Sequence, residues 1–205
     1  MPTPRRTQKQ RREQAEAALL AASAELVVER GARALTLAGV GERAGYSRGI
    51  VTHHFGSKHA LLERLARSVQ AGFVPGLDEL RPGLDRLLGL VDGYIGEIGR
   101  GATAQRAFLV LWTEALTTPE LASVFRERDE AFRADLRDDV AAGIADGTVR
   151  GDLVPAEVAT AIVAQLRGIG LQRLLDPDAI DTEHLRRSIT EQWRRALAAQ
   201  PTRQP

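Results

Sequence analysis

The amino-acid sequence predicts an all-helical fold of about nine helices. Apolar residues recur at three- and four-residue spacing along most of the chain, as on one face of an α-helix. Gly, Pro, Ser and Thr stand between these segments, where helices begin and end. No stretch alternates convincingly with the two-residue period of a strand. The length of 205 residues favours two domains, which we place at residues 1–56 and 57–200.

Composition and charge exclude several classes of protein. The absence of cysteine excludes disulfide frameworks, zinc ribbons and thiol nucleophiles. No segment approaches the roughly 20 apolar residues of a membrane-spanning helix, and no signal-peptide core is visible, so we expect a cytoplasmic protein. Residues 1–59 carry ten Lys and Arg against five Glu, whereas residues 60–205 carry eighteen against twenty-two Asp and Glu. This asymmetry favours a polyanionic partner for the N-terminal part, although basic tails are often only solvated.

The first helix is predicted to span residues 12–30 and to stop at Gly31. Residues 1–12 combine two prolines with five basic residues, which is typical of a mobile arm. The apolar stripe of this helix consists of Ala15, Leu19, Ala22 and Leu26.

Three further helices are each preceded by a hydroxyl residue suited to an N-cap, namely Thr36, Ser47 and Ser57. The second helix, LAGVGERA, is expected to end at Gly45. The third, RGIVTHHF, is expected to point Ile50 and Val51 inward. The fourth, residues 57–74 with its cap, is amphipathic and connects the two domains. Five more helices are predicted near residues 84–100, 103–116, 120–145, 155–175 and 182–199.

The second and third helices, joined by Gly45-Tyr46-Ser47, match the helix-turn-helix pattern. In that motif the second of the two helices enters the major groove of DNA and presents its N-terminal residues to base edges. Gly45 can adopt the left-handed conformation that ends the first of the pair. A plain helical hairpin within a bundle is the alternative interpretation.

Residues 36–62, TLAGVGERAGYSRGIVTHHFGSKHALL, resemble the DNA-binding signature of the TetR/AcrR family of repressors. The resemblance covers about the first 65 residues, whereas the remainder is similar only in length and helical layout. It implies a homodimer that binds near-palindromic operator DNA and is released by a small apolar or amphipathic effector, with no cofactor.

The resemblance also implies a set of DNA contacts. Its base-reading positions correspond to Arg48, Gly49, Thr52 and His53, with Ser47 at the start of the helix, and its phosphate-binding positions to Thr36, His54 and Lys58. An arginine can donate two hydrogen bonds to guanine, and a lysine offers a point charge to phosphate. This sequence lacks the Tyr that the family typically carries in the third helix, so its base preference should differ.

Adjacent histidines could suggest a metal site at His53 and His54. Neighbours on a helix point about 100° apart, however, and no third ligand follows one turn later. We therefore expect hydrogen-bond donors that face DNA, or simple surface residues, and no metal.

The family resemblance further implies a ligand pocket and a dimer interface in the C-terminal domain. Candidate pocket residues are Tyr94, Ile98, Phe108, Leu111, Trp112 and Phe132, although aromatic residues at helical spacing are more often plain core. Candidate interface residues are Val158, Ile162, Leu166, Ile169, Leu185, Ile189 and Trp193, with burial inside one chain as the alternative.

Two other functions remain open from the residues themselves. An enzyme is disfavoured because the chain has no Cys, no Gly-rich phosphate loop and no nucleophile elbow. A helical interaction protein with a vestigial helix-turn-helix would be distinguished by its failure to bind DNA. The sequence therefore favours a DNA-binding transcription regulator, most simply a repressor.

Overall fold

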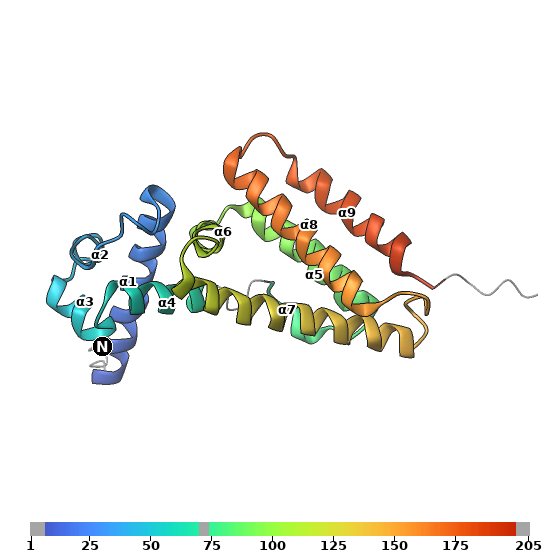
Figure 1. The fold of residues 1–205 in the computed structure, drawn as a ribbon, viewed down its shortest axis with the longest axis horizontal. Helices are drawn as coiled ribbons and strands as arrows, with labels where there is room; N and C mark the ends of the chain where they lie inside the picture. The colour runs from blue at the N-terminus through green and yellow to red at the C-terminus, as the bar shows by residue number, and fades with distance from the viewer. Residues whose placement is uncertain (1–6, 70–73, 200–205) are drawn as a thin grey trace, which may run out of the picture. The chain divides into compact units, whose positions relative to one another are not determined.

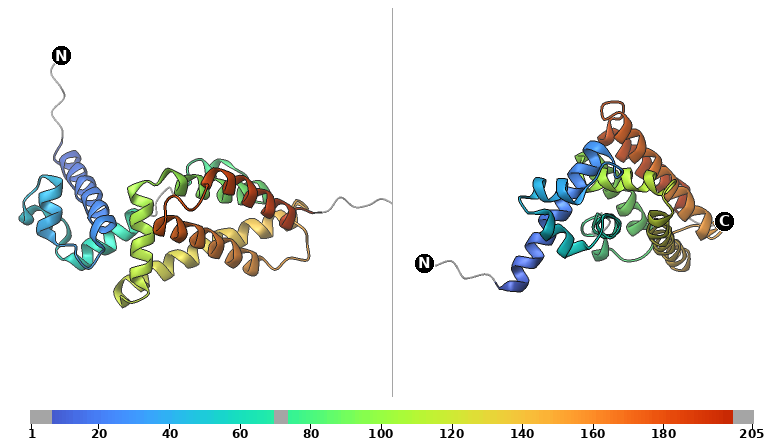
Figure 2. Two further views of the ribbon diagram at one scale, coloured as in Figure 1. Left: turned by 90° about the horizontal axis from the view of Figure 1, so that it is seen from above. Right: turned by 60° about the vertical axis from the view of Figure 1, so that its left-hand side comes forward.

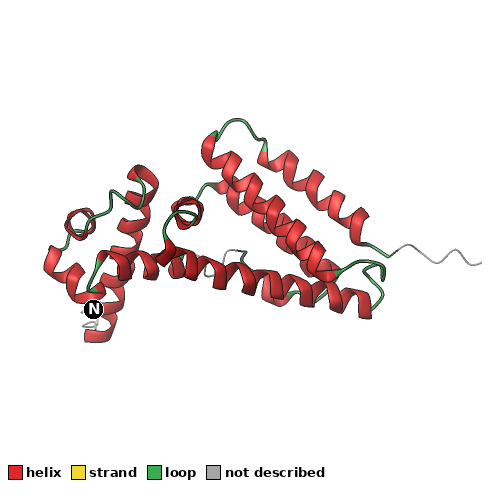
Figure 3. Ribbon diagram, in the orientation of Figure 1, coloured by secondary structure: helices red, strands yellow, loops and turns green. Residues whose placement is uncertain are grey.

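A computed structural model of the chain describes residues 7–69 and 74–199. Within these ranges the extended structure amounts to one isolated bridge between Val149 and Ala198, and the elements are helices (Figure 3). The helices are α1 (Gln8–Arg30), α2 (Leu37–Ala44), α3 (Arg48–Phe55), α4 (Lys58–Ser68), α5 (Leu84–Arg100), α6 (Thr103–Ala115), α7 (Pro119–Ala145), α8 (Pro155–Leu175) and α9 (Thr182–Leu197), with a short 3-10 helix, η1 (Leu77–Glu79). The predicted all-helical fold is confirmed, and η1 is an addition that the sequence patterns did not reveal.

The start of α1 differs from the prediction. The helix begins at Gln8, not near Arg12, and so includes the second half of the expected mobile arm. Thr7 accepts a hydrogen bond from the Gln10 amide at 3.2 Å, and the Gln10 side chain accepts one from the Thr7 amide at 2.9 Å. This reciprocal capping box satisfies two of the unpaired donors at the helix start, which favours early initiation. Residues 1–6 of the predicted arm lie outside the described residues.

The chain divides into two compact units (Figure 1). Unit 1 comprises residues 1–71 and 103–125, and unit 2 comprises residues 72–102 and 126–205. In unit 1, α1 packs against α2, α4 and α6, and α3 packs against α2 and α4. Compactness thus groups α4, α6 and the start of α7 with the helix-turn-helix, whereas the sequence patterns suggested a boundary after residue 56. That boundary in sequence remains a proposal.

Unit 2 is built around α5, which packs against both α8 and α9 (Figure 2). Its core combines apolar residues of α5, α7, α8 and α9, including Leu87, Ile95, Leu136, Ile162 and Leu166, each at most 1% exposed. The buried carboxylate of Asp139 is paired beside this core, since Nε of the partly exposed Arg86 donates to Asp139 Oδ2 at 2.9 Å. Burial raises the pKa of Asp139, and the Arg86 guanidinium opposes that rise. The described helices include none long and apolar enough to cross a membrane.

Candidate DNA-binding surface and ligand-binding core

The turn between α2 and α3 has the geometry that the sequence predicted. Gly45 adopts the left-handed conformation, with φ 75° and ψ 26°, and ends α2. The amide of Tyr46 donates to the carbonyl of Gly41 at 2.8 Å. A Cβ on Gly41 would lie 2.6 Å from the Tyr46 carbonyl oxygen and 3.2 Å from Cγ2 of Val51. The glycine at position 41 therefore allows the turn to pack directly on α2, which fixes α3 against it.

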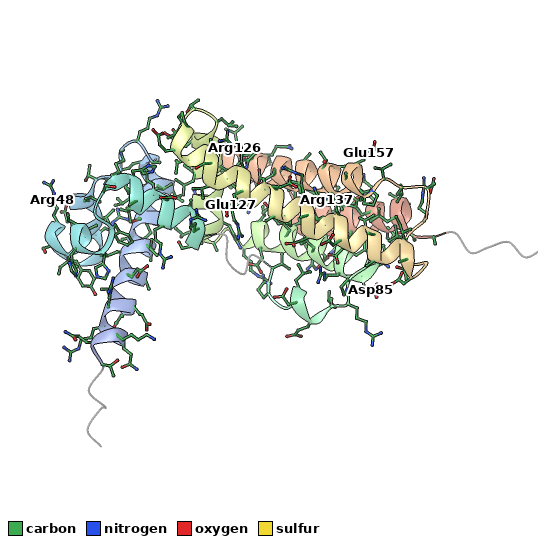
Figure 4. All side chains as sticks on the ribbon, turned by 60° about the horizontal axis from the view of Figure 1, so that its bottom comes forward. Arg48, Asp85, Arg126, Glu127, Arg137 and Glu157 are labelled. Carbon is green, nitrogen blue, oxygen red and sulfur yellow. The ribbon has the colours of Figure 1, made fainter. Side chains whose placement is uncertain are left out.

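Helix α3 presents a polar face to solvent and an apolar residue to the core. Val51 is fully buried, as predicted, whereas Ile50 is 39% exposed and does not point inward. Adjacent positions on a helix lie about 100° apart, so a helix this short buries one of the two and exposes the other. The exposed residues of α3 include Arg48, Gly49, Thr52 and His53. Arg48 is labelled in Figure 4, where its side chain extends away from the ribbon.

The residues predicted to read bases differ in how far their polar groups are already engaged. Arg48 has no ion pair among the described residues and keeps all its N–H donors available. The Thr52 hydroxyl donates to the carbonyl of Arg48 at 3.0 Å, which leaves its oxygen as an acceptor and its methyl group exposed. The rings of His53 and His54 meet edge to face, with centroids 6.0 Å apart. The surface can thus donate through Arg48 and accept through Thr52.

Of the predicted phosphate contacts, Thr36 and Lys58 lie at the starts of helices and His54 lies near the end of one. Thr36 and Ser47 cap α2 and α3, accepting hydrogen bonds from the amides of Gly39 at 3.0 Å and Ile50 at 3.4 Å. His54 is half-buried near the end of α3. Lys58, the first residue of α4, donates to the carbonyl of Arg33 at 2.7 Å. A phosphate contact by Lys58 would therefore require its ammonium to share that hydrogen bond or to leave it.

Ion pairs hold the helix-turn-helix on the rest of unit 1. Arg43 of α2 contacts Glu29 at 2.7 Å and Glu25 at 3.0 Å, both on α1. The hydrogen bond from Arg43 lowers the pKa of Glu29. Arg33 contacts Glu114 of α6 at 2.9 Å. These pairs join α2 to α1, and the loop after α1 to α6.

The residues predicted to line a ligand pocket are divided between the two units. Tyr94, Ile98 and Phe132 belong to unit 2, whereas Phe108, Leu111 and Trp112 belong to unit 1. Tyr94, Ile98, Phe108 and Leu111 are at most 5% exposed, and Trp112 and Phe132 are half-buried. In unit 1 the ring of Phe108 packs on that of Phe125, with centroids 5.7 Å apart. In unit 2 the rings of Tyr94 and Phe132 are stacked, with centroids 6.5 Å apart.

A buried arginine that sequence reasoning missed lies beside this stacked pair. The guanidinium carbon of Arg167, in α8, is 5.8 Å from the Tyr94 ring centroid and 5.7 Å from that of Phe132. Arg167 donates to the Tyr94 hydroxyl and, at 3.1 Å, to Asp129 of α7. Burial raises the pKa of Tyr94, and the nearby charge of Arg167 opposes that rise. The sequence contained a signal for this residue, because Arg167 is the only charged residue between Glu157 and Arg173 in an otherwise uncharged stretch.

The residues predicted for the dimer interface lie mainly inside unit 2 of the single chain. Five of them are at most 8% exposed, namely Val158, Ile162, Leu166, Ile169 and Ile189. Leu185 and Trp193 are partly buried against the same core, and Trp193 Nε1 donates to Gln165 at 2.6 Å. The outward side of α8 instead carries the small residues Ala161, Ala164 and Gly168. A Cβ on Gly168 would meet no atom of the described residues within 4 Å.

The exposed side of α9 is hollowed and charged. The hollow is lined by His184, Arg187, Ser188, Glu191, Gln192, Arg195 and Ala196. The predicted ligand-binding residues are not among those that line it. Arg187 and Arg195 pair along the helix with Glu183 and Glu191, which leaves the surface polar but nearly balanced in charge.

Comparison with known proteins agrees with this arrangement. Residues 19–65 match the family described as bacterial regulatory proteins, tetR family. Residues 83–199, more than half of the chain, match the family described as BetI-type transcriptional repressor, C-terminal. The chain is 31% identical over 131 residues to the transcriptional regulator BetI of Stenotrophomonas maltophilia, covering 62% of this chain and 65% of that protein. It is 25% identical over 196 residues to BetI 1 of Chromohalobacter salexigens, covering 90% and 93% of the two proteins.

Solved structures share the fold at low sequence identity. A transcriptional regulator from Saccharomonospora viridis in complex with choline is 19% identical, with a TM-score of 0.77 over 92% of this chain and 100% of that one. NalD, the secondary repressor of the MexAB-OprM multidrug efflux pump in Pseudomonas aeruginosa, is 24% identical, with a TM-score of 0.70 over 91% and 97%. The family models and the curated relatives describe transcriptional regulators, which are not enzymes. The chain belongs to the TetR family of bacterial transcriptional regulators and carries a BetI-type C-terminal domain.

Proposed function

We propose that this regulator is a repressor that binds a near-palindromic operator as a homodimer, reading bases with α3. The observation that carries the proposal is the exposed face of α3, on which Arg48 has no ion pair while Val51 fixes the opposite face in the core. A recognition helix needs both properties, because base contacts gain specificity only when the helix is held rigidly. Arg48 would donate to guanine, and the Thr52 oxygen would accept from a base amino group.

The test compares two exposed arginines of unit 1. We expect Arg48→Ala to weaken binding to a selected operator by about 1 to 3 kcal/mol and to leave binding to scrambled DNA nearly unchanged. Arg106→Ala, on the exposed side of α6, removes the same charge and serves as the control. The operator is first selected from random duplexes, and affinities are measured by mobility shift. Equal effects of the two substitutions on operator binding would exclude α3 as the reading helix.

The proposed dimer uses the outward sides of α8 and α9. Small residues allow two helices to approach closely, and open space beside Gly168 leaves room for a partner helix. A substitution within the core, such as Ile162→Glu, would unfold unit 2 and would not test assembly. Ala164→Arg is better, since Ala164 is exposed. We expect sedimentation at micromolar concentration to show a dimer for the wild type and a monomer for Ala164→Arg, with helical content unchanged. A wild-type monomer would contradict the proposal.

The proposed effector site lies between α5 and α8, beside Tyr94 and Phe132. The guanidinium of Arg167 already occupies a position next to both rings, where a quaternary ammonium would otherwise bind. Asp129 balances its charge at 3.1 Å. An uncharged amphipathic effector is therefore favoured over a cation, because a second cation beside Arg167 would be repelled.

Choline and its uncharged carbon isostere, dimethylbutanol, test this preference. We expect the isostere to bind more tightly and to loosen operator binding, with a coupling of about 1 to 3 kcal/mol. Calorimetry measures the binding, and mobility shift measures the release of DNA. Phe132→Ala should weaken binding of the isostere. Tighter binding of choline than of its isostere would contradict the proposed site.

A further inference from the structure

The first two turns of α1 extend beyond the part of the helix that is buried. Buried positions of α1 begin at Ala15, whereas residues 7–14 are all exposed. The capping box at Thr7 makes this segment helical, so its side chains are held in fixed directions. It is therefore a structured projection of unit 1, visible with its side chains at the start of α1 in Figure 4.

Two arginines of this projection continue the core-facing stripe of α1. Arg11 and Arg12 precede Ala15 by four and three residues, so they share the helix face of Ala15. Further along, this face carries Leu19 and Leu26, which are 0% and 6% exposed and contribute to the packing of α1 within unit 1. A face that is buried for three turns thus continues as an exposed, basic face beyond the core.

Arg11 and Arg12 also differ from most other cations of unit 1 in whether they contact a carboxylate. Most cations in the described part of unit 1 contact a carboxylate, namely Lys9, Arg30, Arg33, Arg43, Arg64 and Arg67. Among the described residues, Arg11, Arg12, Arg48, Lys58 and Arg106 have no such contact, and of these Lys58 donates to a backbone carbonyl. Arg11 and Arg12 thus share with Arg48 of the recognition helix both exposure and uncompensated charge.

We propose that Arg11 and Arg12 bind backbone phosphates of duplex DNA, flanking the site that α3 reads. The proposal rests on the proposed function, because the duplex must first be held by the helix-turn-helix. DNA carries one negative charge per about 1.7 Å of its axis, so a projection from a DNA-bound unit meets phosphates over a wide range of positions. A preformed helix loses little backbone freedom on binding compared with a mobile arm, which favours contact at modest cost. The partial positive charge at the start of α1 acts in the same direction.

The salt dependence of DNA binding tests the proposal without knowledge of the operator. The probe is a random-sequence duplex of about 30 base pairs, titrated by fluorescence anisotropy between about 50 and 200 mM salt. Each phosphate contact contributes about 0.9 to the slope of log K against log salt concentration, so Arg11→Ala/Arg12→Ala should lower that slope by about 1.8 per bound protomer. Over this range the wild type should lose about 12-fold more affinity per protomer than the double variant.

Two control variants separate a defined contact from general charge. Lys9→Ala removes a positive charge from the same segment, but Lys9 pairs with Glu13 at 3.8 Å and lies six positions before Ala15, about 120° from it around the helix axis. Its slope should remain that of the wild type. Arg11→Lys/Arg12→Lys should also keep the wild-type slope, because phosphate contacts require the charge and not the guanidinium geometry.

Three results would overturn the proposal. A wild-type slope for the double alanine variant would show that neither arginine contacts DNA. A slope loss for Lys9→Ala equal, per charge removed, to that of the double alanine variant would show an unspecific charge effect. A wild type that does not bind duplex DNA would overturn the proposed function together with this inference, whereas the first two results leave that function intact.

Discussion

Replacement of Gly41 by alanine should loosen the junction between α2 and α3. The new Cβ would lie 2.6 Å from the carbonyl oxygen of Tyr46 and 3.2 Å from the carbonyl carbon of Ser47. Both are backbone atoms, so a rotamer change cannot relieve the contact, and the turn must move away from α2. The same movement stretches the 2.8 Å hydrogen bond between the Tyr46 amide and the Gly41 carbonyl.

Two opposing terms set the size of this effect. Overpacking of a well-packed site costs about 1 to 3 kcal/mol. Alanine in place of glycine inside a helix gains about 1 kcal/mol. Because the close contact is to backbone, we expect the upper part of the range and a net loss of about 2 kcal/mol. Gly49→Ala is the matched control, since its Cβ would meet only Ser47 Oγ at an ordinary 3.6 Å. It should gain up to about 1 kcal/mol.

Amide hydrogen exchange measured by mass spectrometry can separate the two variants. A difference of about 3 kcal/mol corresponds to more than 100-fold in the protection of the α2 and α3 amides, since each 1.4 kcal/mol is tenfold. Gly41→Ala should lower this protection and Gly49→Ala should raise it, with α8 unchanged in both. Protection in Gly41→Ala equal to or above that of the wild type would refute the close-packing argument.

Three further substitutions test other parts of the fold. Asp139→Ala removes the buried carboxylate partner of the partly exposed Arg86 guanidinium and should cost about 1.5 to 3 kcal/mol in urea unfolding, and a double-mutant cycle with Arg86→Ala should show coupling between the two side chains. Gly45→Ala places a side chain at φ 75° and should cost about 1 to 2 kcal/mol, seen as a melting temperature lower by several degrees. Hydrogen bonds from two backbone amides of α9 lower the pKa of Asp181 below its usual 3.8. The ionised Asp181 cap therefore stabilises α9 fully above pH 3.8, and this stabilisation is lost as the pH falls through the lowered pKa of the folded state. Amide hydrogen exchange should show that the start of α9 loses protection at acid pH in the wild type and not in Asp181→Asn.

The sequence predicted best those features that depend on residues close together in the chain, such as the ends of helices. Helix ends followed from residues that supply their own caps, as Gly45 and Ser47 do. The early start of α1 was also encoded locally, because Thr7 and Gln10 match the capping-box pattern, but the basic composition around them favoured an arm. Local signals thus placed the helix-turn-helix and its exposed face, while the burial of Val51 and not Ile50 depended on tertiary packing.

The C-terminal domain was less predictable because its contacts join distant segments. Arg167 pairs with residues 73 and 38 positions away in sequence, so the apolar run around it marks it as unusual but no local pattern reveals its partners. The apolar stripe of α8 gave the correct helix, but periodicity does not say whether Ile162 faces its own core or another chain. The structure places it in the core, and this shifts the proposed dimer contacts to the small residues on the other side of α8.

The N-caps of α2 and α3 have a consequence for how this surface could evolve or be engineered. The hydroxyl oxygen of Thr36 accepts from the Gly39 amide at 3.0 Å, which occupies a lone pair and leaves the hydroxyl hydrogen available to a phosphate oxygen. The same hydroxyl group could therefore cap α2 and bind a DNA phosphate at the same time. Aspartate at position 36 would still cap α2 but would repel phosphate, whereas alanine would lose both roles. The two substitutions would separate the cap from the proposed DNA contact at a single position, and Ser47 offers the same choice at the start of α3.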